Sequence, residues 1–250
     1  MQRFEGKVAL ITGAASGMGR ATAIRLASEG AGVYGTDVNA EGLAKTRDEV
    51  ESAGGEMRSG LFDVGDRDAC FASVGEALDA FGRLDVLCNI AGILRVAHAH
   101  EMSVEDWNSV IATNLSGPFF MCQAAIPHLL ETHGNIVGVA SNAGLMGQAY
   151  TAAYCASKGG LVNLTRALAW EYMKRPIRIN AVAPSGTETN LAADANFGED
   201  MDPSLMDRFY GMRGMSQPEE IAGAIAYLAS DEAKSVHGAI WTLDNGITAG

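Results

Sequence analysis

The fold of this chain is decided by the stretch Lys7-Val8-Ala9-Leu10-Ile11-Thr12-Gly13-Ala14-Ala15-Ser16-Gly17-Met18-Gly19. Its first six residues form a short apolar run with β-branched side chains, which is typical of a buried parallel strand. Three glycines then precede a helical pattern from Arg20 to Ser28. A strand, a glycine turn and a helix N-terminus together form an anion site, because bare backbone approaches a pyrophosphate and the helix dipole favours its charge. The spacing is G-x-x-x-G-x-G rather than the commoner G-x-G-x-x-G, so an ordinary tight strand–helix connection is the alternative interpretation.

A second strand-like run, Gly32-Val33-Tyr34-Gly35-Thr36, ends in Asp37. An acid about twenty residues beyond the glycine turn accepts hydrogen bonds from the adenosine ribose hydroxyls of NAD. The same carboxylate would repel the 2′-phosphate of NADP, and neither Ser16 nor Val38-Asn39 supplies a positive charge. We therefore expect NAD as the cofactor, with a turn or helix-capping role for Asp37 as the alternative.

Tyr154 and Lys158 stand four residues apart in Ala153-Tyr154-Cys155-Ala156-Ser157-Lys158. On a helix, positions i and i+4 share a face, so the Lys158 ammonium is expected close to the Tyr154 phenol. A neighbouring cation favours phenolate and lowers the phenol pKa from about 10. A decrease of about three pKa units requires roughly 4 kcal/mol, which is more than one exposed ammonium supplies. The site must therefore be partly dry or hold a second positive charge, such as an oxidised nicotinamide.

Strand-like runs alternate with helical segments along the whole chain. This alternation predicts an α/β fold, a single doubly wound Rossmann domain over residues 1–250 with a seven-stranded parallel sheet flanked by helices. The apolar content of 48% is sufficient for a substantial core. The expected strands are Val8–Thr12, Val33–Thr36, Met57–Leu61, Leu84–Cys88, Asn135–Val139, Ile177–Val182 and Ile240–Leu243.

Several further motifs follow in order, and together with the first ones they resemble the short-chain dehydrogenase/reductase family over nearly the whole chain. Thr12–Gly19 matches the family's TGxxxGxG, and Asp63-Val64 matches its acid–apolar pair beside adenine. Asn89-Ile90-Ala91-Gly92 resembles the NNAG segment, with Ile for its second Asn. The family's catalytic positions fall on Asn114, Ser141, Tyr154 and Lys158, and its PGxVxT and DGG segments on Pro184-Ser185-Gly186-Thr187-Glu188-Thr189 and Asp244-Asn245-Gly246.

The resemblance implies the strand order 3-2-1-4-5-6-7 and an enzyme that transfers a hydride between NAD and an alcohol or ketone. Ser141 would orient the substrate oxygen, and Tyr154 would exchange a proton with it as general acid–base. Lys158 would lower the phenol pKa and hold the nicotinamide ribose, while Asn114, on a helix opening after the capping pattern Ser103-Val104-Glu105-Asp106, would anchor a proton-relaying water. The expected cofactor contacts are Gly13, Ser16, Gly17, Met18, Gly19, Asp37, Asp63, Val64, Asn89, Ala91, Gly92, Tyr154, Lys158, Pro184, Thr187 and Thr189.

One motif departs from the family pattern, because Ser185 replaces its glycine. A Cβ at this position predicts a changed turn in which Gly186 takes the positive φ. Thr189 keeps its distance from Pro184, so we expect it still to reach the nicotinamide carboxamide.

The segment 185–215 is the expected substrate-binding loop. Its acidic residues outnumber its arginines, and its many Met, Leu and aromatic side chains suit an adaptable apolar cover. These features favour a largely apolar, uncharged secondary alcohol or ketone. Two alternatives stay open: an NADPH-dependent 3-ketoacyl-thioester reductase, and a non-catalytic protein that senses NAD.

Composition and charge restrict the partners. The net charge of −12 argues against nucleic acid and anionic membranes, which require a basic face. We find no leader segment and no apolar span of membrane length. The histidines show no metal-binding spacing, so no metal is expected, and the scattered cysteines indicate a reduced cytoplasmic protein: Cys70, Cys88, Cys122 and Cys155.

The chain is also expected to form an oligomer. Residues 152–173 should form a long helix on which Leu161, Leu164, Leu168 and Tyr172 recur at helical intervals. Only part of such an apolar surface can face the sheet, and the family resemblance implies that neighbouring subunits cover the rest, as a homotetramer.

Overall fold

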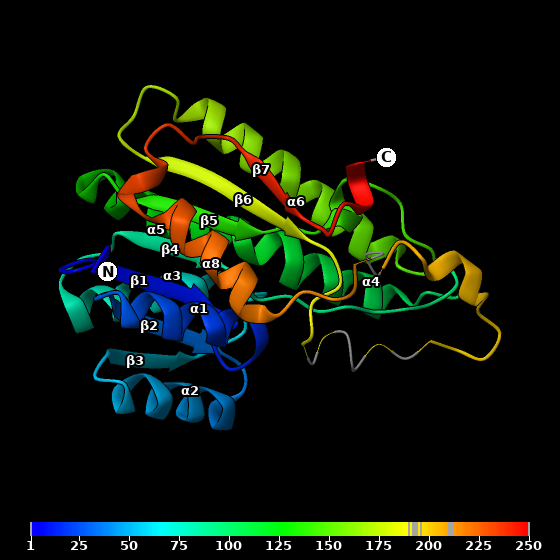
Figure 1. Cartoon of the computed structure of the whole chain (residues 1–250), viewed down its shortest axis with the longest axis horizontal. Coiled ribbons are helices and arrows are strands. Elements are labelled where there is room, and N and C mark those ends of the chain that lie inside the picture. Colours follow the sequence, from blue (N-terminus) through cyan, green and yellow to red (C-terminus); the bar gives the residue numbers. More distant parts are fainter. Residues whose placement is uncertain (1, 190, 192–194, 196, 210–212, 250) are drawn as a thin grey trace.

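The computed structural model describes residues 2–189, 191, 195, 197–209 and 213–249. Its centre is a seven-stranded parallel sheet in the order β3-β2-β1-β4-β5-β6-β7, which confirms the expected order (Figure 1). The strands are β1 (Val8–Thr12), β2 (Gly32–Asp37), β3 (Glu56–Leu61), β4 (Val86–Asn89), β5 (Asn135–Val139), β6 (Arg178–Pro184) and β7 (Ile240–Leu243). The named helices are α1 (Gly17–Ser28), α2 (Ala40–Ser52), α3 (Arg67–Phe81), α4 (Val104–Ile111), α5 (Gly117–Thr132), α6 (Ala152–Glu171) and α8 (Pro218–Ala229).

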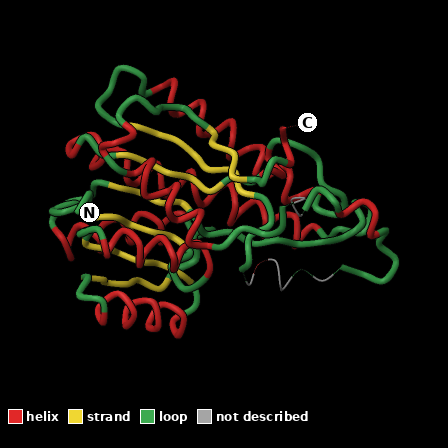
Figure 2. The backbone as a smooth tube through the Cα atoms, in the orientation of Figure 1, coloured by secondary structure: helices red, strands yellow, loops and turns green. Residues whose placement is uncertain are grey.

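Helices cover both faces of the sheet, as Figure 2 shows. One apolar core lies between the sheet and α1, α2 and α8, and a second lies between the sheet and α3, α5 and α6. Successive strand residues point into opposite cores: Ala9 and Ile11 belong to the first and Leu10 to the second. The central strands such as β1 and β5 are buried on both faces and apolar without alternation, which explains why short apolar runs predicted them, whereas β3 is largely exposed.

Local signals explain where several helices begin. Ser103 precedes α4 and its Oγ accepts a hydrogen bond from Asp106 N at 3.0 Å, so the expected cap is present. The helix that follows is not continuous. It is interrupted by a π turn over Ala112–Ser116, in which Gly117 N donates to Ala112 O, before α5 continues. Asn114 therefore lies on a π turn rather than inside a regular helix, and such turns occur often at functional sites.

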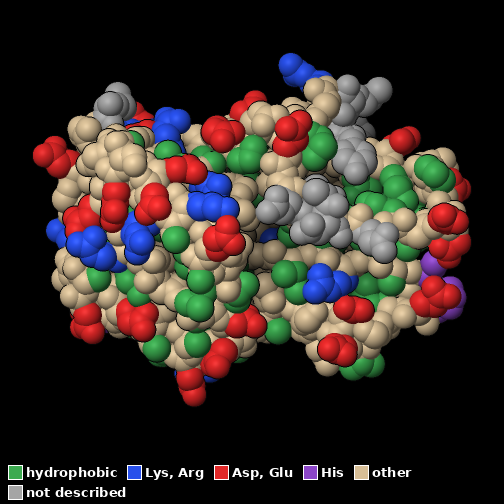
Figure 3. Space-filling view, turned by 90° about the horizontal axis from the view of Figure 1, so that it is seen from below, with side chains coloured by type: hydrophobic (Ala, Val, Ile, Leu, Met, Phe, Trp, Pro, Cys, Tyr) green, Lys and Arg blue, Asp and Glu red, His purple; other side chains and the backbone are tan. Residues whose placement is uncertain are grey.

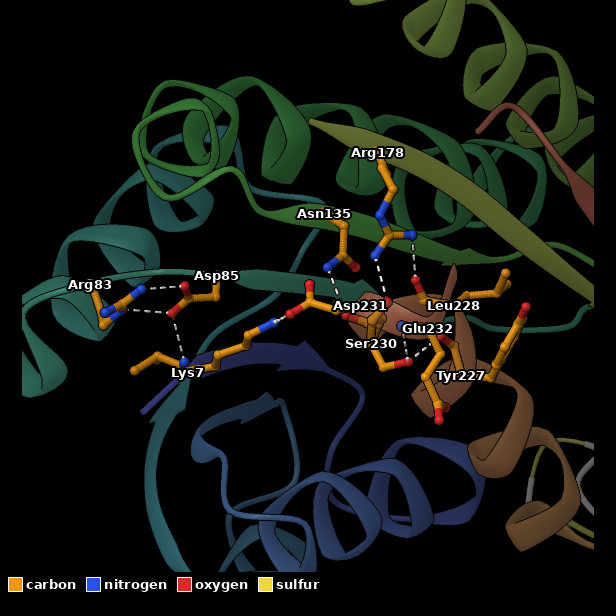
Figure 4. Close-up of polar contacts among 12 residues, drawn as sticks. Lys7, Arg83, Asp85, Asn135, Arg178, Tyr227, Leu228, Ser230, Asp231 and Glu232 are labelled. Carbon is orange, nitrogen blue, oxygen red and sulfur yellow. Dashed lines mark hydrogen bonds and ion pairs between the residues drawn. The ribbon is translucent and has the colours of Figure 1, made fainter. Parts of the chain in front are cut away.

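A polar network closes the amino-terminal edge of the sheet (Figure 4). Arg178 donates to Leu228 O at 2.7 Å and to Ser230 O at 2.9 Å, which satisfies carbonyl groups at the C-terminal end of α8. Asp85 accepts two hydrogen bonds from Arg83, at 2.7 and 2.8 Å, and a third from Val8 N at 2.9 Å. These bonds link the C-terminal end of α8 and the first residues of the strands at one edge of the sheet. The opposite edge holds the cleft described below.

Charged side chains of both signs are scattered over the face seen in Figure 3, with acidic groups spread widely across it. No helix of the described part of the chain is both long and apolar enough to cross a membrane.

Candidate active site

A cleft of about 480 Å³ lies at the carboxyl ends of the strands. Parallel α/β sheets bind their ligands at this edge. The cleft brings together residues that are far apart in the sequence, and most of the expected site residues line it: Gly13, Ser16, Gly17, Met18, Gly19, Asp37, Asp63, Val64, Ala91, Gly92, Ser141, Tyr154, Lys158, Pro184, Thr187 and Thr189. Asn89 and Asn114 lie behind this lining.

The glycines of the first turn are required by close contacts. A Cβ on Gly13 would lie 2.9 Å from the backbone N and Cα of Ala91, and a Cβ on Gly19 would overlap the carbonyl of Gly13. Gly17 has a φ of +50°, and a Cβ there would lie 2.9 Å from Thr189 Cγ2. Side chains at Gly13, Gly17 and Gly19 would therefore collide with the turn itself, with the segment after β4 or with Thr189.

Helix α1 starts in the cleft without a side-chain cap. Its N-cap residue, Ser16, makes no capping hydrogen bond, so this side chain does not satisfy the N–H groups of the first turn. Open N–H groups and the positive end of the helix dipole are the features that hold a pyrophosphate.

Asp37 ends β2 beside this turn. One carboxylate oxygen accepts from Ala15 N at 3.1 Å and the other from Asn39 N at 3.0 Å, and these bonds fix the carboxylate at the cleft wall. Lys158 is the only basic residue among the described residues that line the cleft. A 2′-phosphate bound beside Asp37 would therefore meet a negative charge without a local cation.

Asp63 follows the end of β3 and lines the cleft, whereas Asn89 ends β4 and lies behind the lining. Asp63 Oδ1 accepts from Gly65 N at 2.8 Å, which orders the loop after β3. Asn89 Nδ2 donates to Pro118 O at 3.3 Å and to Cys122 Sγ at 3.4 Å, both on α5. The N–H groups of this side chain thus point toward α5, and a contact between Asn89 and the cofactor stays a prediction.

Ser141, Tyr154 and Lys158 meet on one wall of the cleft. Helix α6 carries Tyr154 and Lys158 on one face, with Lys158 Nζ 5.6 Å from the centre of the tyrosine ring. Lys158 is buried, and its Nζ donates to Val139 O at 2.8 Å, at the end of β5. Ser141 follows the same strand, and its Oγ accepts from Ala143 N at 3.1 Å.

Burial changes the pKa of both groups on α6. It raises the pKa of Tyr154 to about 12, although a hydrogen bond with Ser141 acts in the opposite direction. It lowers the pKa of Lys158 to about 8. The lysine alone therefore does not depress the phenol pKa in this structure. A further positive charge in the cleft, the second of the two conditions derived from the sequence, would lower this pKa.

Asn114 is fully buried, and its side chain holds neighbouring backbone. Its amide accepts from Ile93 N and donates to Ile93 O, both at 2.8 Å, and it donates to Ser157 Oγ at 3.2 Å. A Cβ added to Gly92 would lie 3.3 Å from Asn114 Oδ1 and 3.5 Å from Lys158 Nζ. Asn114 thus positions the segment after β4 against α6, next to the lysine.

Comparison with known proteins agrees with this geometry. A family model described as enoyl-(acyl carrier protein) reductase matches residues 13–248. D-threitol dehydrogenase of Mycolicibacterium smegmatis is 40% identical, covering 98% of this chain and 94% of the relative. The 3-oxoacyl-[acyl-carrier-protein] reductase of Thermotoga maritima is 39% identical, and the match covers 98% of this chain and 99% of the relative. The structure of a short-chain dehydrogenase from Mycobacterium paratuberculosis bound to NAD has a TM-score of 0.91 and 30% identity, covering 99% of this chain and all of the other.

The chain belongs to the short-chain dehydrogenase/reductase family. This short-chain dehydrogenase/reductase is accordingly an enzyme that acts on CH–OH or C=O groups.

The family's Pro-Gly turn takes an unexpected form here. Neither Ser185 nor Gly186 has a positive φ, so the expectation that Gly186 would absorb one is wrong. The turn is held by backbone contacts instead: Gly186 N donates to Phe209 O, and Ser216 N donates to Gly186 O, both at 3.0 Å. The Ser185 hydroxyl is buried and has no hydrogen-bond partner among the described residues.

The segment 185–215 covers the cleft with aromatic side chains. The rings of Phe197 and Phe209 meet edge to face at 5.5 Å, and Leu191 lines the cleft with them. Of the residues in this segment that the sequence singled out, Asp194, Tyr210 and Met212 lie outside the described residues. Sequence motifs missed further lining residues, which no pattern marks, among them Phe62, Ile93, Leu94, Asn142 and Gln148.

The apolar positions that recur along α6 face the cores. Leu161 and Leu168 are buried in the cores, and Leu164 and Tyr172 pack against them. The exposed apolar side chains lie at other positions, including Trp170 at 77% and, on α4, Val104 at 75% exposure.

Proposed function

We propose that this chain transfers a hydride between NAD and a largely apolar secondary alcohol or ketone, with Tyr154 as the general acid–base. The observation that carries the proposal is the meeting of Ser141, Tyr154 and Lys158 in one cleft with Asp37 and the glycine turn. A sensor without turnover has no use for the three polar groups. We also propose that residues 1–250 form one catalytic domain, in which residues 185–215 are the substrate-binding loop.

The cleft suits NAD along its whole length. The glycine turn and the N-terminus of α1 would take the pyrophosphate, and Asp37 would accept hydrogen bonds from the adenosine ribose. Asp63 and Val64 would border the adenine, and Ala91, Gly92, Pro184, Thr187 and Thr189 the nicotinamide half. When bound, the nicotinamide supplies or accepts the hydride and, in its oxidised form, adds a positive charge to the site.

The chain's own residues would orient the substrate and move its proton. Ser141 Oγ accepts a bond from Ala143 N, and its own hydrogen, which donates to Asn142 Oδ1 at 3.2 Å, would turn to the substrate oxygen. Tyr154 would accept the hydroxyl proton during oxidation and return it during reduction. Lys158 would hold the nicotinamide ribose, and Asn114, which fixes the segment beside Lys158 Nζ, would anchor the water that relays the proton outward.

The substrate is proposed from the lining of the cleft and from relatives. Leu94, Phe197 and Phe209 give the cleft an apolar lining. Ser141 and Tyr154 would bind one oxygen atom of the substrate by hydrogen bonds. Relatives of similar identity are a meso-2,3-butanediol dehydrogenase of Serratia marcescens and a cyclohexanol dehydrogenase of an Acinetobacter strain. Both names describe oxidation of secondary alcohols.

A direct assay tests the proposal. The purified protein is mixed with NAD or NADP and a panel of secondary alcohols, including diols, and formation of the reduced cofactor is followed by absorbance. We expect turnover with NAD on at least one apolar secondary alcohol. Tight NAD binding without turnover on any substrate would instead identify a sensing protein. Preferential reduction of 3-ketoacyl thioesters with NADPH would identify the carrier-protein type of reductase.

We further propose a cytoplasmic homotetramer. Each of α4, α5 and α6 carries exposed apolar side chains, among them Val104, Trp107, Phe119 and Trp170, and two-fold axes would cover them with other subunits. All four cysteines are unpaired, as in a reducing compartment. A light-scattering mass near 26.2 kDa at micromolar concentration would exclude the oligomer.

A further inference from the structure

Two carboxamides, those of Asn142 and Gln148, form a closed ring of hydrogen bonds with one backbone carbonyl of the substrate-binding loop. Gln148 Nε2 donates to Asn142 Oδ1 at 3.1 Å and to Arg208 O at 2.8 Å. Asn142 Nδ2 donates to the same Arg208 carbonyl at 3.1 Å. Both hydrogens of Gln148 and both lone pairs of the Arg208 oxygen are thereby used.

The ring also reaches the catalytic wall. Ser141 Oγ lies 3.2 Å from Asn142 Oδ1 and donates to it. This distance is long for a hydroxyl donor, whose usual value is about 2.7–2.8 Å. Asn142 Oδ1 accepts from both Gln148 and Ser141, and sharing its two lone pairs makes it a weaker acceptor for the Ser141 hydrogen. Asn142 is 2% exposed and its bond with Ser141 is buried, so this bond is formed away from bulk water, whereas the bond from Gln148 to the Arg208 carbonyl is exposed.

The loop side of the ring is anchored as well. Arg208 Nη1 donates to Gly147 O at 3.2 Å, and the next carbonyl, that of Phe209, accepts from Gly186 N at 3.0 Å. The backbone at residues 208–209 therefore joins the turn after β6 to the segment before α6.

We infer that Asn142 and Gln148 are positioning residues that tie the Ser141 hydroxyl to the Arg208 carbonyl of the substrate-binding loop. The bond from Gln148 weakens Asn142 Oδ1 as an acceptor for Ser141, so the Ser141 hydrogen can leave it for the substrate oxygen. Without the Gln148 amide, Asn142 Oδ1 holds this hydrogen more strongly and keeps it from the substrate. The inference rests on the proposed role of Ser141 and extends it to two residues that the family motifs do not include.

A double-mutant cycle tests the coupling. Gln148→Met keeps the length of the side chain and removes its donors, while Gln148→Glu keeps the shape and places a carboxylate against two carbonyl oxygens. Both are compared in the native background and in Ser141→Ala, with enough enzyme to resolve residual turnover. Gln2→Ala, which removes an exposed carboxamide near the N-terminus, is the matched control.

We expect Gln148→Met to lower kcat/KM for the alcohol roughly tenfold, the effect of losing about one hydrogen bond at the reacting centre. Gln148→Glu should lower it further, and the affinity for NADH should stay unchanged in both. In the Ser141→Ala background, Gln148→Met should have little additional effect, because the hydroxyl it acts on is gone.

Equal activity of the native protein and the Gln148→Met variant would overturn the inference, as would losses that add fully to that of Ser141→Ala. The proposed function fails separately: if Ser141→Ala alone keeps full turnover, the role of the serine is wrong, whatever the Gln148 variants do.

Discussion

Replacing Lys158 with methionine is expected to stabilise the protein at pH 7 while it abolishes turnover. Lys158 is 3% exposed, and the only bond recorded for its Nζ among the described residues goes to a neutral carbonyl, that of Val139. A buried ammonium without a carboxylate partner destabilises the folded state, because water solvates the charge in the unfolded chain. Methionine fills a similar space without the charge.

The size of the effect follows from the pKa. Burial lowers the pKa of Lys158 from 10.5 to about 8. Each pKa unit corresponds to 1.36 kcal/mol, so the charged form costs roughly 3 kcal/mol of folding free energy at pH 7. Losing the bond to the Val139 carbonyl removes about 1 kcal/mol of this gain. The expected net gain is about 2 kcal/mol, or roughly 4–8 °C in Tm for a chain of this size.

The pH dependence of stability separately checks whether Lys158→Met raises or lowers the free energy of unfolding. The folded-state pKa lies below the unfolded one, so the folded protein binds fewer protons between about pH 8 and 10.5. The cost of the charge is fully present below pH 8 and disappears as pH rises through this window. The advantage of Lys158→Met should therefore be largest at pH 7 and should decline toward pH 10.5.

Urea unfolding of the cofactor-free protein at pH 7 and pH 10, at one fixed protein concentration, measures both effects. Lys45→Met is the matched control, because Lys45 is exposed on α2 and pairs with exposed Glu41, so it should shift stability by less than about 0.5 kcal/mol. A variant as stable as the native protein at pH 7, or one whose advantage grows with pH, would refute the reasoning. Steady-state assays should show that the more stable protein is inactive.

Three further predictions concern single side chains. Tyr154→Phe should lower turnover by about 10²–10⁴-fold while NADH affinity, measured by fluorescence titration, stays unchanged; retention of most turnover would remove Tyr154 from the mechanism. The native protein should favour NAD over NADP by at least about tenfold in kcat/KM, and Asp37→Ala should narrow this gap chiefly through KM; equal use of both cofactors by the native enzyme contradicts the role of Asp37. Ser185→Ala removes a buried hydroxyl that has no partner among the described residues and keeps the Cβ, so it should raise the unfolding free energy of the cofactor-free protein by about 1 kcal/mol in urea. A loss of stability in Ser185→Ala would show that the hydroxyl is already bonded in the folded chain.

Much of the fold was readable from the sequence because its signals are local. All seven strands were predicted to within about two residues, and the central ones were the clearest because burial on both faces makes their sequences continuously apolar. The glycine turn was equally clear, because a Cβ at Gly13 or Gly19 would collide with nearby backbone atoms, so the turn requires glycine at both positions. Fixed spacings then assigned Ser141, Tyr154 and Lys158 to one site.

Other features depended on contacts between distant residues. Gln148 meets the Arg208 carbonyl sixty residues away in the sequence, and no periodicity marks such a pair. The direction of the Asn89 amide, the π turn at Asn114 and the ordinary φ of Gly186 likewise follow from what packs around them.

The sequence by itself determined the fold class and, through family resemblance, the strand order, and it predicted which residues bind the cofactor and which are catalytic. Only the tertiary structure decided the surroundings of those groups. Burial raises the pKa of Tyr154 and lowers that of Lys158, so the neighbouring lysine alone does not depress the phenol pKa. The reason is physical: spacing along a helix fixes which side chains are neighbours, but the pKa values depend on how much water the rest of the fold removes.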